Sequence, residues 1–316
     1  MSHEMIVDNK TWKFKIALYE ENTYHTEILG TFLYYCRENN IKVDYYNDSD
    51  QSYFYEHYVK LFNMNIIRYK NVELLDRVDE YKYILVGTMG KISKIETAFY
   101  TNLDKFICIF HNYDDQNGND ITNPDIKKLV MTPLNKTIGS FILPIFSPQI
   151  VTDRKMGKTI TLVGRFKSRE WTHIMPLVDS GYSIQIITRR AKMVPKTLAE
   201  FKHPNVKVFL KRNADDMMRI INKSNYLLCL TDYNSWYYKD RLSGIIALSF
   251  NYGVPLLMPK LLNEIYGFDC VVEYDTYMEI PNIIENTNYD NIVKLLNKTT
   301  GDIIRNNNVI LNNIFI

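Results

Sequence analysis

The chain has 316 residues, of which 46% are apolar and 23% are charged, the composition of an ordinary globular protein. Its formal net charge of +2 provides no general attraction to nucleic acid or to an anionic membrane, so anion binding must come from local basic clusters. This length suits two domains of about 150 residues, each large enough to bury a core.

The cysteines and the first residues indicate the compartment. Cys36, Cys108, Cys229 and Cys270 lie far apart without metal-ligand spacing, and three of them lie in apolar runs. We expect buried thiols in a reducing compartment rather than disulfides or catalytic thiols. Residues 1–15 lack the apolar core of a signal peptide, and no run approaches the roughly 20 apolar residues that cross a bilayer. We therefore expect a cytoplasmic protein, and the richness in Asn, Tyr, Ile and Lys suggests an AT-rich genome, bacterial or viral.

Strand and helix patterns alternate along the first half. The expected strands are 14–19, 41–46, 83–86 and 106–110, followed by extended pieces at 129–132 and 141–145; the expected helices are 25–37, 53–62 and 93–102. Such alternation predicts a doubly wound parallel sheet.

A polar segment with Pro and Gly, residues 147–158, is the expected linker, and a second alternating series follows it. Strands are expected at 159–163, 183–188 and 206–210, with helices at 171–179 and after Asn213. We predict one domain over residues 1–150 and another over 151–285. Residues 286–316 read as two helices that pack back across the domain junction.

The most informative stretch, residues 225–259, reads as strand, polar loop, helix and strand. Ser243 can cap the helix, Gly253 can end it in a left-handed conformation, and Pro255 prevents its continuation. A helix that starts at Ser243 and Gly244, beyond the end of a strand, directs free N–H groups into the crevice where α/β proteins bind anions. The alternative is that Ser243 is only an N-cap.

Basic loops follow three strands of the second half. Residues 164–169, GRFKSR, place three cationic side chains where they can converge on a diphosphate, and the pairs at 189–190 and 211–212 should line the same crevice. Each loop could instead be a solvated surface. The predicted anion-binding residues are Gly164, Arg165, Lys167, Arg169, Thr188, Arg189, Lys211, Ser243 and Gly244.

Two residues are candidates for acid–base chemistry. His111 follows a strand of the first half, and Asp114 or Asp115 could orient it; the alternative is a structural histidine. Asp240 precedes the helix of the second half and could accept hydrogen bonds from ribose or sugar hydroxyls, or could merely favour the helix dipole.

Several functions are excluded by missing motifs. No G-x-G-x-x-G follows the first strand, and the residues there, 20–24, are acidic where a pyrophosphate would lie, which argues against a dinucleotide-binding oxidoreductase. The sequence shows no nucleophile elbow, Walker A loop or zinc-binding H-E-x-x-H. Asp48-Ser49-Asp50 is interpreted as a turn, so no bound metal is expected.

Residues 159–259 resemble the donor-binding domain of GT-B glycosyltransferases, particularly the retaining group classed as family 4. The resemblance lies in LVGRF, in HPNVKVFL, and in ALSFNYGVPLLM with its Gly-Val-Pro close. It implies that Arg165 contacts the donor diphosphate and that Lys167 or Arg169 replaces the lysine of the family. The glutamate pair of the family is not intact, because its positions hold Asp240 and Leu248.

The resemblance implies an α/β fold with two Rossmann-like domains facing across a cleft. It implies a glycosyltransferase that moves a sugar from a nucleoside diphosphate sugar, such as a UDP- or GDP-sugar, to a glycan, lipid or protein. His111 and Asp240 would be catalytic, with no cofactor or metal. Leu248 motivates one alternative, a non-catalytic GT-B-like module that binds nucleotide or glycan. A sugar-nucleotide epimerase of GT-B shape is a further alternative.

Overall fold

The structure is a computed structural model. It describes residues 11–21, 26–48, 53–89, 92–111, 123–146, 156–164, 166, 170–188, 192, 194–210, 213–231, 236–239 and 241–315.

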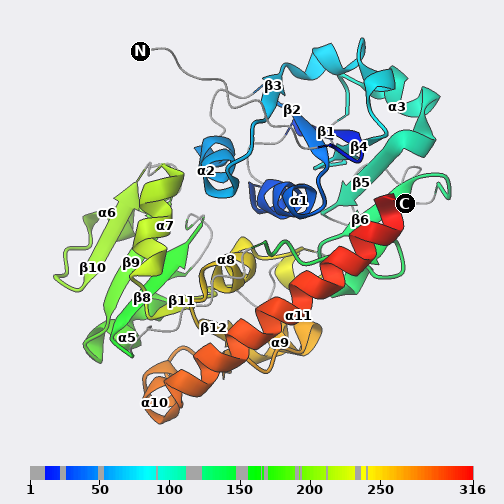
Figure 1. Cartoon of the computed structure of the whole chain (residues 1–316). Helices are drawn as coiled ribbons and strands as arrows, with labels where there is room; N and C mark the ends of the chain where they lie inside the picture. Colours follow the sequence, from blue (N-terminus) through cyan, green and yellow to red (C-terminus); the bar gives the residue numbers. More distant parts are fainter. Residues whose placement is uncertain are drawn as a thin grey trace.

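The first domain contains a sheet of seven parallel strands in the order β3-β2-β1-β4-β5-β6-β7 (Figure 1). The strands are β1 (Lys15–Tyr19), β2 (Lys42–Tyr46), β3 (Ile67–Tyr69), β4 (Tyr83–Val86), β5 (Phe106–Phe110), β6 (Lys127–Val130) and β7 (Ser140–Phe141). The helices are α1 (Thr26–Glu38), α2 (Tyr53–Phe62) and α3 (Glu96–Thr101), with 3₁₀ turns η1 (Asn71–Leu74), η2 (Val78–Glu80), η3 (Leu103–Lys105) and η4 (Pro133–Asn135).

The second domain contains a sheet of six parallel strands in the order β10-β9-β8-β11-β12-β13. The strands are β8 (Thr159–Val163), β9 (Ser183–Thr188), β10 (Val206–Leu210), β11 (Tyr226–Leu228), β12 (Leu256–Pro259) and β13 (Val272–Tyr274). The helices are α5 (Met175–Asp179), α6 (Lys196–Glu200), α7 (Ala214–Asn222), α8 (Gly244–Tyr252), α9 (Lys260–Tyr266), α10 (Ile280–Asn286) and α11 (Tyr289–Phe315), with 3₁₀ turns η5 (Trp171–Ile174) and η7 (Trp236–Tyr238).

Both sheets are doubly wound, as the alternating pattern predicts. In each sheet the chain first forms a central strand and then adds strands outward to one edge. It then crosses back to the centre and adds the strands on the other side. The direction reverses between β1 and β4 in the first sheet and between β8 and β11 in the second. Ligands of such folds bind beyond the carboxyl ends of the strands at these switch points. The expected architecture of two Rossmann-like domains is confirmed.

One apolar core joins the two domains. It contains residues of α1 and α2 from the first domain and of α7, α8 and α11 from the second part of the chain. Two further cores cover the opposite faces of the two sheets. The four cysteines are free and buried, as expected.

The segment that leaves β7 is fixed by asparagine side chains. Asn251 of α8 accepts a hydrogen bond from the Phe146 backbone N–H at 2.8 Å and donates to the Pro144 carbonyl at 3.2 Å. Asn307 of α11 donates to the Leu143 carbonyl at 2.6 Å. This segment is therefore fastened to the second domain before the predicted linker, of which only residues 156–158 are described.

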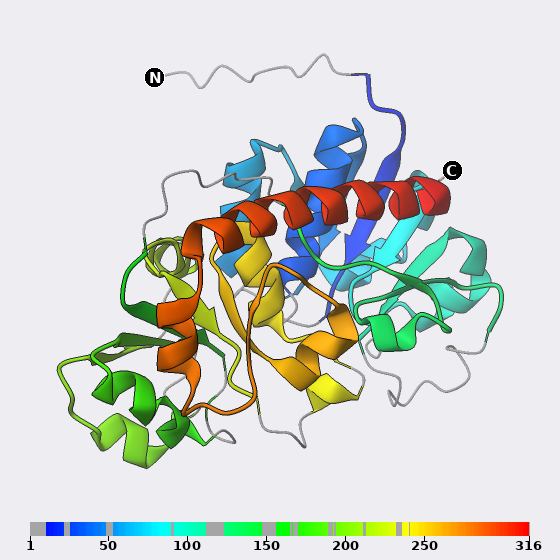
Figure 2. The same cartoon turned by 90° about the horizontal axis from the view of Figure 1, so that it is seen from below.

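Helix α11 runs along both domains (Figure 2). The Tyr35 hydroxyl of α1 donates to Asn312 Oδ1 at 2.8 Å, and the Phe315 ring stacks on the Tyr35 ring with centroids 5.5 Å apart. The two helices expected over this stretch are one helix of 27 residues. The predicted domain boundaries at residues 150 and 285 stay predictions.

Three other expected elements differ in extent. The expected helix 171–179 begins as the 3₁₀ turn η5 and becomes α-helical from Met175, with Pro176 in its first turn. The expected helix 93–102 is described as α-helical only over Glu96–Thr101. Of the expected extended piece 141–145, only Phe141 pairs in the sheet, because the following residues turn toward α8 and α11.

Candidate active site

Helix α8 begins at the carboxyl edge of the second sheet. Ser243 is the N-cap residue, with extended backbone, and Gly244 is the first helical residue. Cys229 directly follows β11, and its Sγ lies 4.0 Å from Ser243 Oγ. The positive end of the helix dipole therefore lies beside the switch point between β8 and β11.

The end of α8 matches the sequence prediction. Gly253 adopts a left-handed conformation with φ of 59°, and the Val254 N–H donates to the Ser249 carbonyl at 3.0 Å. Pro255 then leads into β12. Because α8 is apolar on nearly all sides, burial between the domains holds it in place rather than an amphipathic face.

Ser243 occupies the predicted cap position without making the capping bond. Its side chain accepts no hydrogen bond from the first turn of α8. The side chain is 3% exposed, so the hydroxyl lies in the protein interior next to Cys229. Ser243 is thus an N-cap by backbone conformation only.

Two more predicted residues lie at the same edge of the sheet. Gly164 follows β8, has φ of 131°, and donates its N–H to the Ile187 carbonyl at 3.0 Å. A positive φ of this size favours glycine. Thr188 ends β9 and is 2% exposed, and its Oγ1 has no hydrogen-bond partner among the described residues. Gly164, Thr188, Ser243 and Gly244 therefore share one edge.

Six predicted site residues lie outside the described residues: Arg165, Lys167, Arg169, Arg189, Lys211 and Asp240. The structure does describe Phe166, whose side chain is fully buried in the core that covers the outer face of the second sheet. It also describes Leu248, which packs half-buried against the core between the domains. Leu248 therefore makes an apolar contact at the position where the resemblance would place a carboxylate.

A cavity of about 500 Å³ opens at the carboxyl ends of β11, β12 and β13. Thr231, Tyr238 and Tyr274 line it, and the Tyr238 and Thr231 hydroxyls are hydrogen-bonded at 3.2 Å. Its size and its mixture of apolar walls and a few polar groups are typical of small-molecule sites. Tyr238 lies in the turn before α8, so this cavity borders the helix start.

Aromatic residues missed by the sequence prediction form the far wall of this cavity. The Tyr277 ring stacks on the His173 ring with centroids 4.3 Å apart, and the Tyr277 hydroxyl donates to the Thr231 carbonyl at 3.1 Å. Tyr274 donates to the Cys229 carbonyl at 2.8 Å, and burial raises its pKa well above the usual value. No local pattern indicated these residues, because His173 comes from η5 and the two tyrosines from the end of β13 and just after it, about 100 residues later in the chain.

The first domain presents a different chemistry at its own switch point. His111 follows β5, and its Nε2 lies 2.9 Å from the Gly87 carbonyl oxygen. Because a carbonyl only accepts, Nε2 carries the hydrogen. Glu20 follows β1, is 7% exposed, and accepts a hydrogen bond at Oε2 from the Thr88 hydroxyl at 3.0 Å. Asp114 and Asp115, the predicted partners of His111, lie outside the described residues.

A second cavity of about 500 Å³ lies between the domains. Pro133 and Leu134 of η4 face Leu261 and Glu264 of α9 across it, and Tyr238 is part of its lining. Because η4 follows the carboxyl end of β6 and α9 follows that of β12, the carboxyl edges of the two sheets face each other here.

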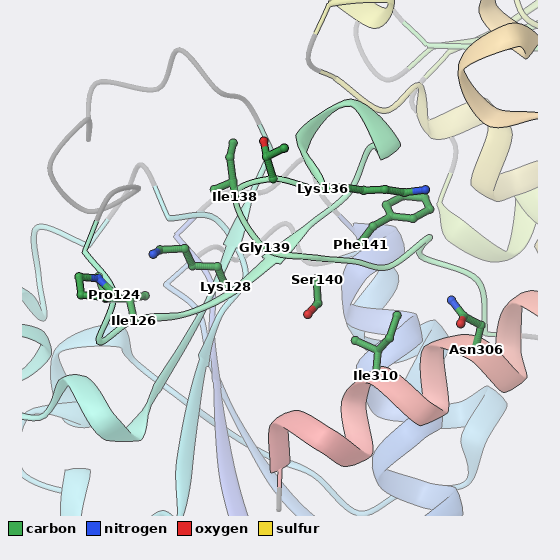
Figure 3. A pocket seen from close by; sticks show the side chains of 11 residues that line it. Pro124, Ile126, Lys128, Lys136, Ile138, Gly139, Ser140, Phe141, Asn306 and Ile310 are labelled. Atoms are coloured by element: carbon green, nitrogen blue, oxygen red, sulfur yellow. The ribbon is translucent and has the colours of Figure 1, made fainter.

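The largest of the described pockets lies away from the cavity between the domains. Its volume is about 690 Å³, and Lys128, Lys136 and Ser140 from the β6–β7 edge surround it with Asn306 and Ile310 of α11 (Figure 3). Lys136 also lies over the Phe141 ring, with Nζ 5.4 Å from its centroid. This pocket is open and shares no residue with the edge that carries the α8 start.

The described residues offer neither a metal site nor a membrane-spanning helix. No three His, Cys, Asp or Glu side chains gather there in a metal-ligating arrangement. No helix in that part of the chain has both the length and the apolar character needed to span a bilayer.

Solved structures of several proteins are similar to this chain over nearly its whole length. Anabaena Alr3699/HepE, in complex with UDP and glucose, matches 92% of this chain and 95% of its own with a TM-score of 0.62 at 10% identity. The chain has the GT-B fold. An alpha-glucosyltransferase in complex with UDP-glucose and DNA containing an abasic site matches 90% of this chain and 94% of its own, with a TM-score of 0.64 at 10% identity.

The GT-B fold here is also similar to an epimerase. UDP-GlcNAc 2-epimerase from Neisseria meningitidis, bound to UDP-GlcNAc, matches 92% of this chain and 99% of its own, with a TM-score of 0.51 at 13% identity. No protein-family model and no curated protein sequence matches the chain.

Proposed function

We propose that this GT-B chain is a glycosyltransferase that takes a sugar from a nucleoside diphosphate sugar, with UDP as the carrier. The observation that carries the proposal is the start of α8 at the switch point of the second sheet, on the same sheet edge as Gly164 and Thr188. Similar structures hold UDP or UDP-glucose. Free N–H groups at a helix start suit a diphosphate, whose negative charge grows as the sugar leaves.

The basic loop that follows β8 would complete this site. From the sequence, Arg165, Lys167 and Arg169 bind the diphosphate, while Arg189 and Lys211 line the nucleotide side of the crevice. Asp240 would contact sugar or ribose hydroxyls. His111 would act from the first domain, across the cleft, on the sugar or the acceptor. No metal is required in this scheme, because cationic side chains and the helix start neutralise the diphosphate.

Calorimetry with UDP, GDP, ADP, CMP and TDP tests the donor site. We expect UDP to bind best, and Arg165→Ala to weaken it by about 10- to 100-fold, the loss of one charge-assisted hydrogen bond. Lys136→Ala is the matched control, since it removes one positive charge at the distant β6–β7 edge. Absence of nucleotide binding, or equal effects of the two variants, would contradict the proposal.

A test of sugar transfer itself requires a panel of possible acceptors. Glycans, lipids and proteins follow from the resemblance, and DNA is included because one similar structure contains it. That nucleic acid is not a partner stays a prediction from the weak net charge. The assay measures sugar transferred from UDP-glucose and UDP-GlcNAc, in EDTA, where we expect activity to persist.

Epimerisation is the second candidate function, because UDP-GlcNAc 2-epimerases share the fold. Release of an isomerised sugar and UDP from UDP-GlcNAc without any acceptor would select it. A non-catalytic module is the third, suggested by Leu248 in place of an acid. Binding of UDP-sugar with neither transfer nor isomerisation would select that reading.

A further inference from the structure

A buried carboxylate lies at the switch point of the first sheet. Glu20 follows β1 and its side chain is held from the neighbouring strand β4, through the Thr88 hydroxyl at 3.0 Å. The Asn47 side chain donates to the Glu20 carbonyl at 2.8 Å and so fixes its backbone from β2. Burying a carboxylate is costly unless hydrogen bonds hold it, and here the Thr88 hydroxyl donates one to Glu20 Oε2.

Gly87 makes room for this carboxylate. A Cβ on Gly87 would lie 2.4 Å from Glu20 Oε2, closer than any real contact. The carbonyl of the same Gly87 accepts the hydrogen bond from His111 Nε2 at 2.9 Å. Glu20 and His111 are therefore neighbours across one glycine, where the ends of β1, β4 and β5 converge.

The negative charge at the carboxyl ends of β1, β4 and β5 suits a hydroxyl group of a ligand better than a diphosphate. Glu20 and Glu21 would repel a phosphate here, whereas the α8 start in the second domain would attract one. A neutral hydroxyl can donate its hydrogen to a carboxylate. His111 donates its Nε2–H to the Gly87 carbonyl and is thereby held beside this carboxylate.

We propose that Glu20 is the base that accepts the proton of the acceptor hydroxyl, an inference that rests on the proposed glycosyltransferase function. The O–H bond breaks and its proton moves to the Glu20 carboxylate. The acceptor oxygen forms a bond to the anomeric carbon while the bond from that carbon to the diphosphate oxygen breaks. The electron pair leaves with the nucleoside diphosphate. A single displacement of this kind inverts the anomeric configuration.

The test compares Glu20→Gln with Glu21→Gln. Glu21 is the neighbouring carboxylate, and its Oε1 accepts from the Tyr19 hydroxyl, so the same substitution there is a matched control. We expect Glu20→Gln to lower kcat by about 10²- to 10⁴-fold with unchanged UDP affinity and melting temperature. It should also remove the acidic limb of the pH–rate profile. Glu20→Asp should keep that limb at reduced kcat, and the product should have inverted configuration by NMR.

Each other outcome has a distinct meaning. If the wild-type chain transfers and Glu20→Gln keeps its kcat or its acidic limb, or if Glu21→Gln loses as much, the role of Glu20 is overturned while the proposed function stands. Retained configuration in the product would also overturn it. If the wild-type chain binds no nucleotide and transfers no sugar, the proposed function fails, and the assignment of Glu20 fails with it.

Discussion

Gly87 shows how a single missing side chain shapes the first domain. In Gly87→Ala the new Cβ would meet Glu20 Oε2 at 2.4 Å, so the backbone or the carboxylate must move. We expect the free energy of unfolding to fall by about 1–3 kcal/mol, the usual effect of overpacking, as measured by urea denaturation.

The control for this prediction is Gly301→Ala inside α11. There a Cβ would meet only Arg305 Nη1, at 3.5 Å, at the far end of a flexible side chain. Alanine favours a helix interior, so we expect a gain of about 0.5–1 kcal/mol. Changes of the same sign in both variants would contradict the packing argument.

Site residues that lie next to a local sequence pattern could be predicted from the sequence. Site residues that only the tertiary structure brings together could not. The sequence predicted Gly164 and Thr188 at strand ends and Ser243 at a helix start, because each directly follows or precedes a strong local pattern. From the sequence, the negative charge of Glu20 indicated only that a phosphate would be repelled there. Its burial depends on Gly87 and Thr88, which come from another strand and leave no signal near Glu20.

The two helix starts of α7 and α8 allow a test at the level of the element. Asn213 Oδ1 accepts from the Asp216 N–H at 2.7 Å, whereas Ser243 makes no such bond. We expect Asn213→Ala to lower the free energy of unfolding by about 1 kcal/mol and Ser243→Ala to lower it less. Ser243→Ala should mainly weaken UDP binding. Equal destabilisation by both would show that Ser243 caps α8 after all.

Elements with local start and stop signals could be predicted from the sequence. Gly253 and Pro255 end α8 as expected. Two helices were expected over residues 286–316, yet α11 continues without interruption through Thr300 and Gly301. Thr300 is buried and returns its hydroxyl to the Leu296 carbonyl at 2.7 Å, and packing against both domains holds the helix together. Such tertiary support overrides local propensity.

At the level of the whole molecule, a hydrogen bond between side chains joins α2 of the first domain to α7 of the second. His57 Nδ1 lies 2.6 Å from Asp215 Oδ1, and this hydrogen bond lowers the pKa of Asp215. A carboxyl with a lowered pKa stabilises the fold above its unfolded pKa, and this contribution is lost as the pH falls through the folded value.

Asp215→Asn should therefore lower the free energy of unfolding at pH 7 by less than about 1 kcal/mol, because this side chain is 64% exposed. It should also flatten the loss of stability between pH 5 and pH 3, measured by urea denaturation at several pH values. Asp216→Asn is the control, since Asp216 pairs with Arg219 within α7. A steeper acid dependence in Asp215→Asn than in the wild type would contradict this sign.

The fold of each domain followed from the alternation of strands and helices, but their docking did not. The shared core brings together side chains such as Phe146 and Tyr58, whose rings meet edge to face at 5.1 Å. Contacts of this kind join positions far apart in the sequence and depend on the complete three-dimensional arrangement. Periodicity reports only which face of an element is buried, not what covers it.

The path of α11 has a consequence for synthesis on the ribosome. Phe315 packs against the rings of Tyr35 and Tyr83, which leave the ribosome long before it does. At about 5–20 residues per second, roughly tens of seconds separate them. Throughout that interval the nascent first domain lacks the cover that α11 later provides. Completion of the two domains is therefore one coupled event rather than two successive ones.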